Sequence, residues 1–192
     1  MRTRRTRTEP PSPPTQTLPS TLYLDTQFLF AYLVADDADH EAAAIIGRRL
    51  EALVEGGFAR AYLSITVLDE LAWKLSGVVY DDENDAPGAW RQLSQPEQRR
   101  AYRVHATTVG VLLLLLLEQP WISVLPVDEE VCDRLPLTLT EHRLPPADAC
   151  HLTCAARHRV RGILTNDRRF AELTDSPVEI VTYGPRRTTE SR

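Results

Sequence analysis

Five short strand-like runs alternate with longer helical patterns over most of this 192-residue sequence. The runs cover residues 22–24, 60–63, 122–124, 163–165 and 178–181, and the patterns between them repeat apolar residues every three or four positions. Strands that alternate with helices form parallel pairs, because each helix returns the chain to the edge where the previous strand began. We therefore predict an α/β fold, a sandwich in which helices cover both faces of a mostly parallel central sheet.

The helical patterns lie at residues 28–34, 39–53, 66–74, 96–118, 128–135 and 147–158. The acidic stretch 77–89 contains Pro87 and Gly88, so we expect an exposed loop there. The apolar run Val109–Leu117 is about half the roughly 20 residues of a membrane-spanning helix. We therefore expect no membrane span, and interpret the run of leucines as part of the core or as an interface between two copies of the chain.

The two ends of the chain differ in composition from the rest. Residues 1–19 are rich in Arg, Pro, Thr and Ser, which predicts a disordered tail, and residues 185–192 are expected to form a C-terminal tail. One folded domain is then expected at residues 20–184. The whole chain has a net charge of −5, but without the tails 15 basic residues face 25 acidic ones. Nucleic acid can bind so acidic a domain only where cations or local arginines offset the charge.

The three cysteines, Cys132, Cys150 and Cys154, include no CxxC pair. This spacing argues against a disulfide framework and against a zinc site, and it favours buried, reduced thiols. We expect a cytoplasmic protein.

Four acids stand at the boundaries of predicted elements or beside apolar sequence. Asp25 and Asp167 follow strands, Glu70 lies on a helix, and Asp148 lies in the first turn of another helix. Carboxylates that converge repel one another, and a cation relieves the repulsion. Oxygen ligands favour Mg²⁺ or Mn²⁺, which activate water for phosphodiester hydrolysis. We therefore predict that these acids are both the catalytic residues and the metal ligands.

Each candidate also has a purely structural interpretation. Glu70 fits a solvated helix position, Asp148 fits the positive end of a helix dipole, and Asp167 fits a turn. His151 lies three residues after Asp148 on the same helix face, where it either contacts the substrate or packs. The arginines near Asp167 fit either a solvated face or an RNA contact.

The sequence around the four acids resembles the PIN-domain nucleases, and among them the VapC-type toxins of type II toxin–antitoxin systems. The resemblance spans residues 22–181, and the four motifs occur in the order typical of that family. The motifs are Leu24-Asp25-Thr26, Ser64 with Glu70 six residues later, Leu144 to Ala149 around Asp148, and Thr165-Asn166-Asp167 with Phe170.

This resemblance implies a PIN-like α/β/α sandwich and a divalent-metal-dependent endoribonuclease. It implies that the four acids hold one or two Mg²⁺ or Mn²⁺ ions, that RNA is the substrate, and that an antitoxin protein and a second copy of the chain are partners. Residues expected to orient the acids or water are Thr26, Ser64, Thr165 and Asn166; candidate RNA contacts are Arg168, Arg169 and His151. Many relatives carry another acid where Arg169 stands, so the arginine either reduces the metal count or binds phosphate.

Two other functions fit the same resemblance. The chain is alternatively a PIN-type nuclease that processes cellular RNA or cuts DNA, in which case no antitoxin gene needs to lie beside its own. It is alternatively an inactive PIN-like binding module. All four acids are present, and this argues against the inactive module.

Overall fold

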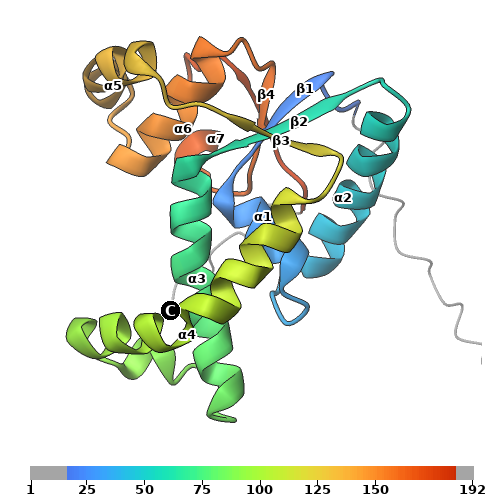
Figure 1. Cartoon of the computed structure of the whole chain (residues 1–192). Helices are drawn as coiled ribbons and strands as arrows, with labels where there is room; N and C mark the ends of the chain where they lie inside the picture. Colours follow the sequence, from blue (N-terminus) through green and yellow to red (C-terminus); the bar gives the residue numbers. More distant parts are fainter. Residues whose placement is uncertain (1–16, 185–192) are drawn as a thin grey trace, which may run out of the picture.

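The computed structural model describes residues 17–184 (Figure 1). The predicted tails lie largely outside the described residues, since residues 1–16 and 185–192 are not among them. Leu18 already belongs to the hydrophobic core. The fold therefore begins before residue 20, where the predicted N-terminal tail ended.

The centre of the molecule is a five-stranded sheet in the order β3-β2-β1-β4-β5. Every neighbouring pair of strands is parallel, which confirms the predicted sheet. The strands are β1 (Thr21–Leu24), β2 (Arg60–Ser64), β3 (Ile122–Leu125), β4 (Gly162–Leu164) and β5 (Glu179–Val181). Tyr23 of the central strand lies between Tyr62 and Ile163, and it is fully buried because helices cover both faces of the sheet.

The connections place helices on both faces of the sheet (Figure 1). The chain first moves outward from β1 to β3 and then returns to β4 on the other side of β1. Right-handed crossovers therefore put the first four helices on one face and the last three on the other. These are α1 (Thr26–Leu33), α2 (His40–Glu55), α3 (Ile65–Glu83) and α4 (Gln95–Leu117), then α5 (Glu129–His142), α6 (Pro146–Arg157) and α7 (Arg168–Ala171).

The predicted loop at residues 77–89 is wrong for its first half, because α3 continues to Glu83. The chain turns only at residues 84–89, where Gly88 has a φ of 82°. The carboxylate of Asp81 accepts hydrogen bonds from the backbone N–H groups of Gly88 (2.8 Å) and Trp90 (2.7 Å). Asp81 therefore belongs to the structure that closes the turn before the short 3-10 helix η1 (Trp90–Gln92).

After α3, helix α5 differs most from its predicted bounds, the other predicted helices differ by one or two residues at their ends, and α7 was not predicted. Helix α5 ends at His142 instead of 135, although Pro136 lies inside it. Its second half packs against α6, where the hydroxyl of Thr153 donates to that of Thr138 at 2.9 Å. Helix α1 begins at Thr26 instead of 28, because Asp25 caps it.

The end of α3, η1 and the start of α4 form an arm that extends away from the sheet (Figure 1). We call residues 73–105 the α3–α4 arm. Helix α4 has 23 residues and is, by length and composition, apolar enough to cross a membrane. Its exposed residues Arg99, Arg100 and Arg103 and its packing on α3 are, however, typical of a helix in a folded domain. The three cysteines are free, and Cys150 and Cys154 are buried as predicted.

Candidate active site

The predicted acids meet at the carboxyl edge of the sheet, between β1 and β4. Asp25 directly follows β1, and Asp167 follows β4 after two residues. Because the strand order continues in opposite directions from β1, this edge contains a topological switch point, where α/β sheets bind their ligands. The fold thus places two acids from distant parts of the chain at the position where chemistry is expected.

Asp25 is fixed by hydrogen bonds to both oxygens of its carboxylate. Oδ1 accepts from the backbone N–H of Thr26 at 2.8 Å, and Oδ2 accepts from the hydroxyl of Thr165 at 2.6 Å. The side chain is almost fully buried. Thr165 therefore orients an acid, as the resemblance implied.

Glu70 reaches the same place from the second turn of α3. Its Oε2 accepts from the hydroxyl of Thr26 at 2.6 Å and from Nε2 of His151 at 3.0 Å. Burial acts to raise the pKa of Glu70, but the hydrogen bonds from His151 and Thr26 outweigh it and lower the pKa. Glu70 is therefore held in its charged form, ready to bind a cation.

His151 is fully buried between the acids and the sheet, a position that sequence reasoning did not identify. Its Nε2 lies 3.8 Å from Oδ1 of Asp25, and its Nδ1 shares a hydrogen bond of 3.0 Å with the hydroxyl of Tyr23. The Tyr23 hydroxyl in turn lies 2.6 Å from Oγ of Ser64. Burial acts to lower the pKa of His151, but the hydrogen bond to Glu70 and the charge of Asp25 raise it.

Asp148 and Asp167 are joined by Arg169. A guanidinium nitrogen of Arg169 lies 2.9 Å from Asp148 and 3.7 Å from Asp167. Asp167 also caps α7, accepting from the backbone N–H of Arg169 at 2.8 Å. Burial raises the pKa of Asp148, the hydrogen bond from Arg169 lowers it, and the charges of Asp167 and Asp25 raise it further. Arg169 therefore supplies positive charge to two acids that repel each other.

The donor groups fit a divalent ion. Ligand atoms of Asp25, Glu70 and His151 all lie within 4.8 Å of one another, close enough to share one ion. Asp148 and Asp167 are not part of this group of three; burial is the main cause of the raised pKa of Asp148, and the charges of Asp167 and Asp25 contribute less. Carboxylate oxygens suit Mg²⁺ and Mn²⁺, and the imidazole nitrogen adds a ligand that transition metals accept more readily than magnesium.

The remaining predicted residues lie in different environments. The side-chain oxygen of Asn166 accepts from the backbone N–H of Tyr183 at 3.1 Å, so it fixes the end of the sheet instead of an acid. Ser64 contacts Tyr23 and not an acid. Arg168 and Arg169 are exposed, but His151 has no exposed surface with which to contact RNA. Asp69 is exposed beside Glu70.

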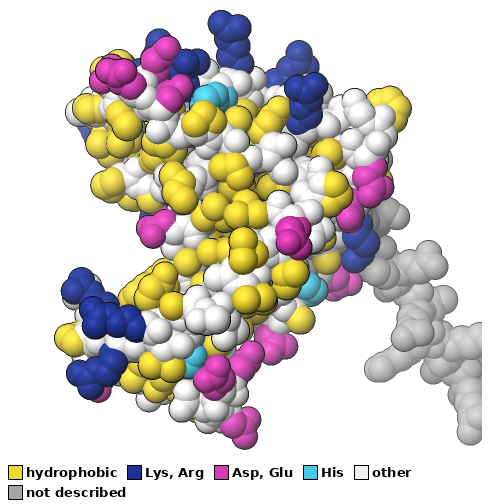
Figure 2. Space-filling model, viewed as in Figure 1, with side chains coloured by type: hydrophobic (Ala, Val, Ile, Leu, Met, Phe, Trp, Pro, Cys, Tyr) yellow, Lys and Arg dark blue, Asp and Glu magenta, His cyan; other side chains and the backbone are white. Residues whose placement is uncertain are grey.

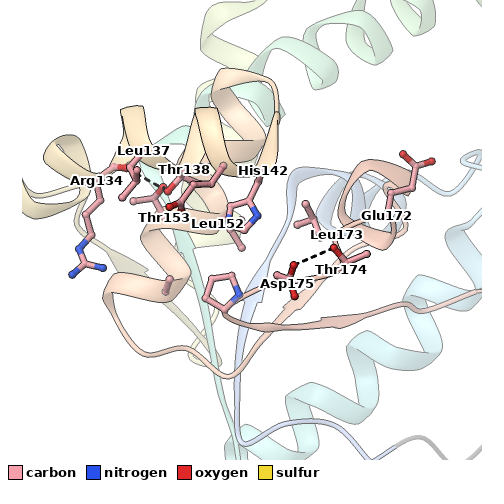
Figure 3. A pocket seen from close by; sticks show the side chains of 13 residues that line it. Arg134, Leu137, Thr138, His142, Leu152, Thr153, Glu172, Leu173, Thr174 and Asp175 are labelled. Atoms are coloured by element: carbon pink, nitrogen blue, oxygen red, sulfur yellow. Dashed lines mark hydrogen bonds between the residues drawn. The ribbon is translucent and has the colours of Figure 1, made fainter.

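A separate pocket of about 550 Å³ lies between α5, α6 and the segment after α7 (Figure 3). Leu137, Leu152 and Leu173 line it together with Thr138 and Thr153. It contains none of the four acids, although Glu141, Glu172 and Asp175 also line it. Its position and lining assign it no part in the chemistry of the switch point.

The fold and the site define a class of α/β proteins whose sheet edge carries a cluster of carboxylates able to hold a divalent ion. Residues 22–175 match the PIN domain, and the chain belongs to this family of nucleases. A comparison with curated protein sequences finds no match.

Solved structures of similar fold come from bacterial toxin–antitoxin proteins. VapBC2 from Rickettsia felis, solved with a DNA fragment from its promoter, has a TM-score of 0.51 and 14% identity, and covers 85% of this chain and 99% of its own. VapC20 from Mycobacterium tuberculosis, described as a toxin that cleaves the sarcin–ricin loop, has a TM-score of 0.47 and 18% identity, and covers 80% of this chain and 96% of its own. The similarity to VapBC2 supports the fold.

Proposed function

We propose that this protein is a divalent-metal-dependent endoribonuclease that hydrolyses RNA phosphodiester bonds, and that it is the toxin of a toxin–antitoxin pair. One observation carries the proposal: Asp25 after β1 and Glu70 of α3 have ligand atoms within 4.8 Å of each other and of His151, while Arg169 joins Asp148 to Asp167 near the charge of Asp25. Family membership supports nuclease chemistry at this place.

The residues of the chain divide the work of the reaction. Asp25 and Glu70, with Asp148 and Asp167 beside them, hold Mg²⁺ or Mn²⁺. A divalent ion in such a site lowers the pKa of a bound water and stabilises the charge that develops on the phosphate. The hydrogen bonds of Thr26 and Thr165 fix the carboxylates before the ion arrives, so little reorganisation is needed during the reaction.

Arg169 is the residue most suited to bind the scissile phosphate. Its guanidinium is 58% exposed, and it lies against Asp148 at the mouth of the site. Guanidinium groups bind phosphate in a two-pronged geometry. Asp148 and Asp167 would share their charge with a bound divalent ion, and the guanidinium of Arg169, now held by these acids, would then be free to contact the RNA.

A partner protein and a second copy of the chain complete the proposal. VapBC2, which has the same fold, is a toxin–antitoxin complex, so we expect an antitoxin that covers this site and a cytoplasmic location for the pair. The outer face of α4 exposes Val111, Leu114 and Leu115, each at least half accessible. An exposed apolar stripe of this kind is suited to pairing two copies.

Cleavage assays with purified protein test the enzymatic proposal. Labelled RNA and a DNA strand of the same sequence are incubated with Mg²⁺, with Mn²⁺ or with EDTA, and the cleaved ends are mapped. We expect internal cuts in RNA that require the ion and that disappear in Asp148→Asn. Equal cleavage in EDTA, or preference for DNA, would contradict it.

The toxin assignment has its own test. Expression of the wild-type chain is expected to stop bacterial growth, and co-expression of the protein encoded by a short neighbouring reading frame is expected to restore it. Normal growth on expression of an active nuclease would point to cellular RNA processing instead.

A further inference from the structure

A second cavity adjoins the acids where the α3–α4 arm meets the body of the domain. Its volume is about 470 Å³, and it is lined by Asp69, Glu70, Trp73, Lys74 and Tyr102. Glu70 belongs to both this cavity and the candidate metal-binding cluster, so the two are adjacent. Whatever occupies the cavity lies beside the proposed reaction centre.

Two aromatic rings form one wall of this cavity. The rings of Trp73 and Tyr102 have centroids 6.0 Å apart and an interplanar angle of 32°. Trp73 also contacts the buried Trp90 edge-to-face at 5.3 Å, which holds its ring in place. Nevertheless 38% of Trp73 is exposed to solvent. An indole fixed by neighbours but open on one side is prepared to receive another flat ring.

The charges around the cavity restrict what that ring can be. The carboxylates of Asp69 and Glu70 repel a phosphate at the inner wall, whereas a neutral base is not repelled. Lys74 also lines the cavity, and its ammonium group lies over the ring of Phe30, with Nζ 5.6 Å from the ring centroid. Further out, Arg99 and Arg103 are exposed on the same helix as Tyr102. These charges fit a nucleic acid whose neutral base lies inside the cavity and whose phosphates lie outside it.

The shape of the molecule agrees with a strand entering along the arm. Figure 2 shows a hollow between the arm and the rest of the domain, with basic side chains on the arm beside it. Basic residues that follow the backbone, with aromatic rings for the bases, are the features by which proteins bind single-stranded nucleic acid. A base in a duplex is stacked on both sides and cannot enter such a cavity.

We propose that the cavity between α3 and α4 binds one nucleobase of a single-stranded RNA substrate, stacked on Trp73 and Tyr102, next to the phosphate to be cut. This inference rests on the proposed ribonuclease function and adds a substrate subsite to it. Arg99 and Arg103 bind the phosphates on the outer side of that base.

The test compares two probes in EDTA, so that binding is measured without cleavage. One is a short fluorescein-labelled oligoadenylate, and the other is a ribose-phosphate oligomer of the same length without bases. Fluorescence anisotropy is expected to show that the wild-type chain binds the oligoadenylate about 10-fold more tightly, the value typical of one stacked base. Equal affinity for the two probes would assign the cavity to another occupant, such as a protein side chain, and would overturn the proposal.

Substitutions at Trp73 test whether the preference for the probe with bases arises in this cavity. Trp73→Leu is expected to weaken oligoadenylate binding about 10-fold and to leave the probe without bases unaffected, while Trp73→Phe retains most of the affinity. Phe58→Leu removes an aromatic side chain that is 75% exposed outside the cavity, and it should change neither value. Equal losses for both probes in Trp73→Leu would overturn the proposal, and thermal melting of each variant identifies losses caused by unfolding.

The arginines give an independent readout. The double variant Arg99→Gln/Arg103→Gln is expected to weaken binding of both probes equally and to reduce the dependence of affinity on salt. A loss confined to the oligoadenylate would contradict the assigned arrangement. Base-dependent binding by a chain that does not cleave RNA would refute the proposed function alone, whereas cleavage without base-dependent binding would refute the base-binding cavity alone.

Discussion

The inner acids, Asp25 and Glu70, and the outer acids, Asp148 and Asp167, are held in place by different means. The inner acids accept hydrogen bonds from the threonines of two elements and from His151, all of them buried. The outer acids share one guanidinium, that of Arg169, which is mostly exposed. Mostly uncharged donors therefore hold the carboxylates of the inner acids in place. The negative charge of the outer acids is instead offset by one charged side chain that can be displaced.

This difference assigns separate roles to the two pairs. A carboxylate fixed by buried neutral donors keeps its geometry whether or not an ion is present. A carboxylate paired with an exposed arginine exchanges that partner easily, because exposed ion pairs contribute little stability. In the proposed mechanism, the inner pair would define where the ion binds, and the outer pair would couple ion binding to the release of Arg169 toward the RNA.

The strongest test of the inner pair is Asp25→Asn, which is expected to lower the rate of RNA cleavage at least about 100-fold. The single oxygen of asparagine still caps α1, and its NH₂ group faces the hydroxyl of Thr165, which can accept a hydrogen bond as well as donate one, so the melting temperature should change little. Asp128→Asn makes the same change at the cap of α5, where Asp128 accepts from the N–H of Val131 at 3.0 Å. It should leave cleavage intact, and an equal effect of the two variants would remove Asp25 from the site.

A smaller loss is expected from His151→Gln, which tests whether the buried imidazole belongs to the inner pair. Removal of a group that orients or supplies metal ligands typically costs about 10- to 100-fold in metal affinity. We expect this loss in Mn²⁺ titrations followed by calorimetry, with a smaller loss for Mg²⁺ because imidazole favours transition metals.

The control for this variant is His105→Gln. His105 is also buried, but it lies in the α3–α4 arm, 3.4 Å from Glu83. The variant His105→Gln should leave Mn²⁺ affinity unchanged. Unchanged Mn²⁺ affinity in His151→Gln would leave the histidine with a purely structural role.

The same contrast explains how much of the site was readable in the sequence. Asp25, Glu70, Asp148 and Asp167 stand at strand ends or at the start of helices, and the topology of a parallel sheet brings such positions together. His151 was predicted only as a neighbour of Asp148 and as a candidate RNA contact, not as a buried partner of Glu70. Its bond to Glu70 joins residues 81 positions apart, and its contact with Tyr23 joins residues 128 apart. No local pattern encodes a contact of that kind.

The fold shows the same limit at the level of helices. The parallel sheet followed from the order of strands and helices, but the end of α3 did not, because residues 77–83 have the acidic composition of a loop. Packing with the arm keeps these residues helical: Tyr80 contacts Trp90 and His105, whose rings lie 5.9 and 6.0 Å away. A tertiary contact of this kind overrides local propensity.

The outer pair is tested by Arg169→Gln, which is expected to raise the affinity for metal and to weaken the binding of substrate. Removal of a positive charge beside Asp148 should raise Mn²⁺ affinity about 5-fold, the value of one charge pair in contact in water. The KM for RNA should rise, because the phosphate loses its partner. Arg60→Gln is the control, because Arg60 is exposed at the start of β2, at the opposite edge of the sheet. If Mn²⁺ affinity falls instead, Arg169 supports the metal site and does not compete with it.

The smallest effect is expected from Ser64→Ala, which tests how far the inner pair extends. Ser64 reaches the site only through Tyr23 and His151, so its loss should lower the free energy of unfolding by about 1 kcal/mol and change cleavage less than about 3-fold. Ser76→Ala is matched to it, since Ser76 is a buried serine on α3 whose hydroxyl donates to the carbonyl of Ala72 at 2.7 Å. Denaturation should give similar values for the two variants. A loss of cleavage as large as that of His151→Gln would place Ser64 in contact with the ion or the RNA, and the inner site would then extend to the end of β2.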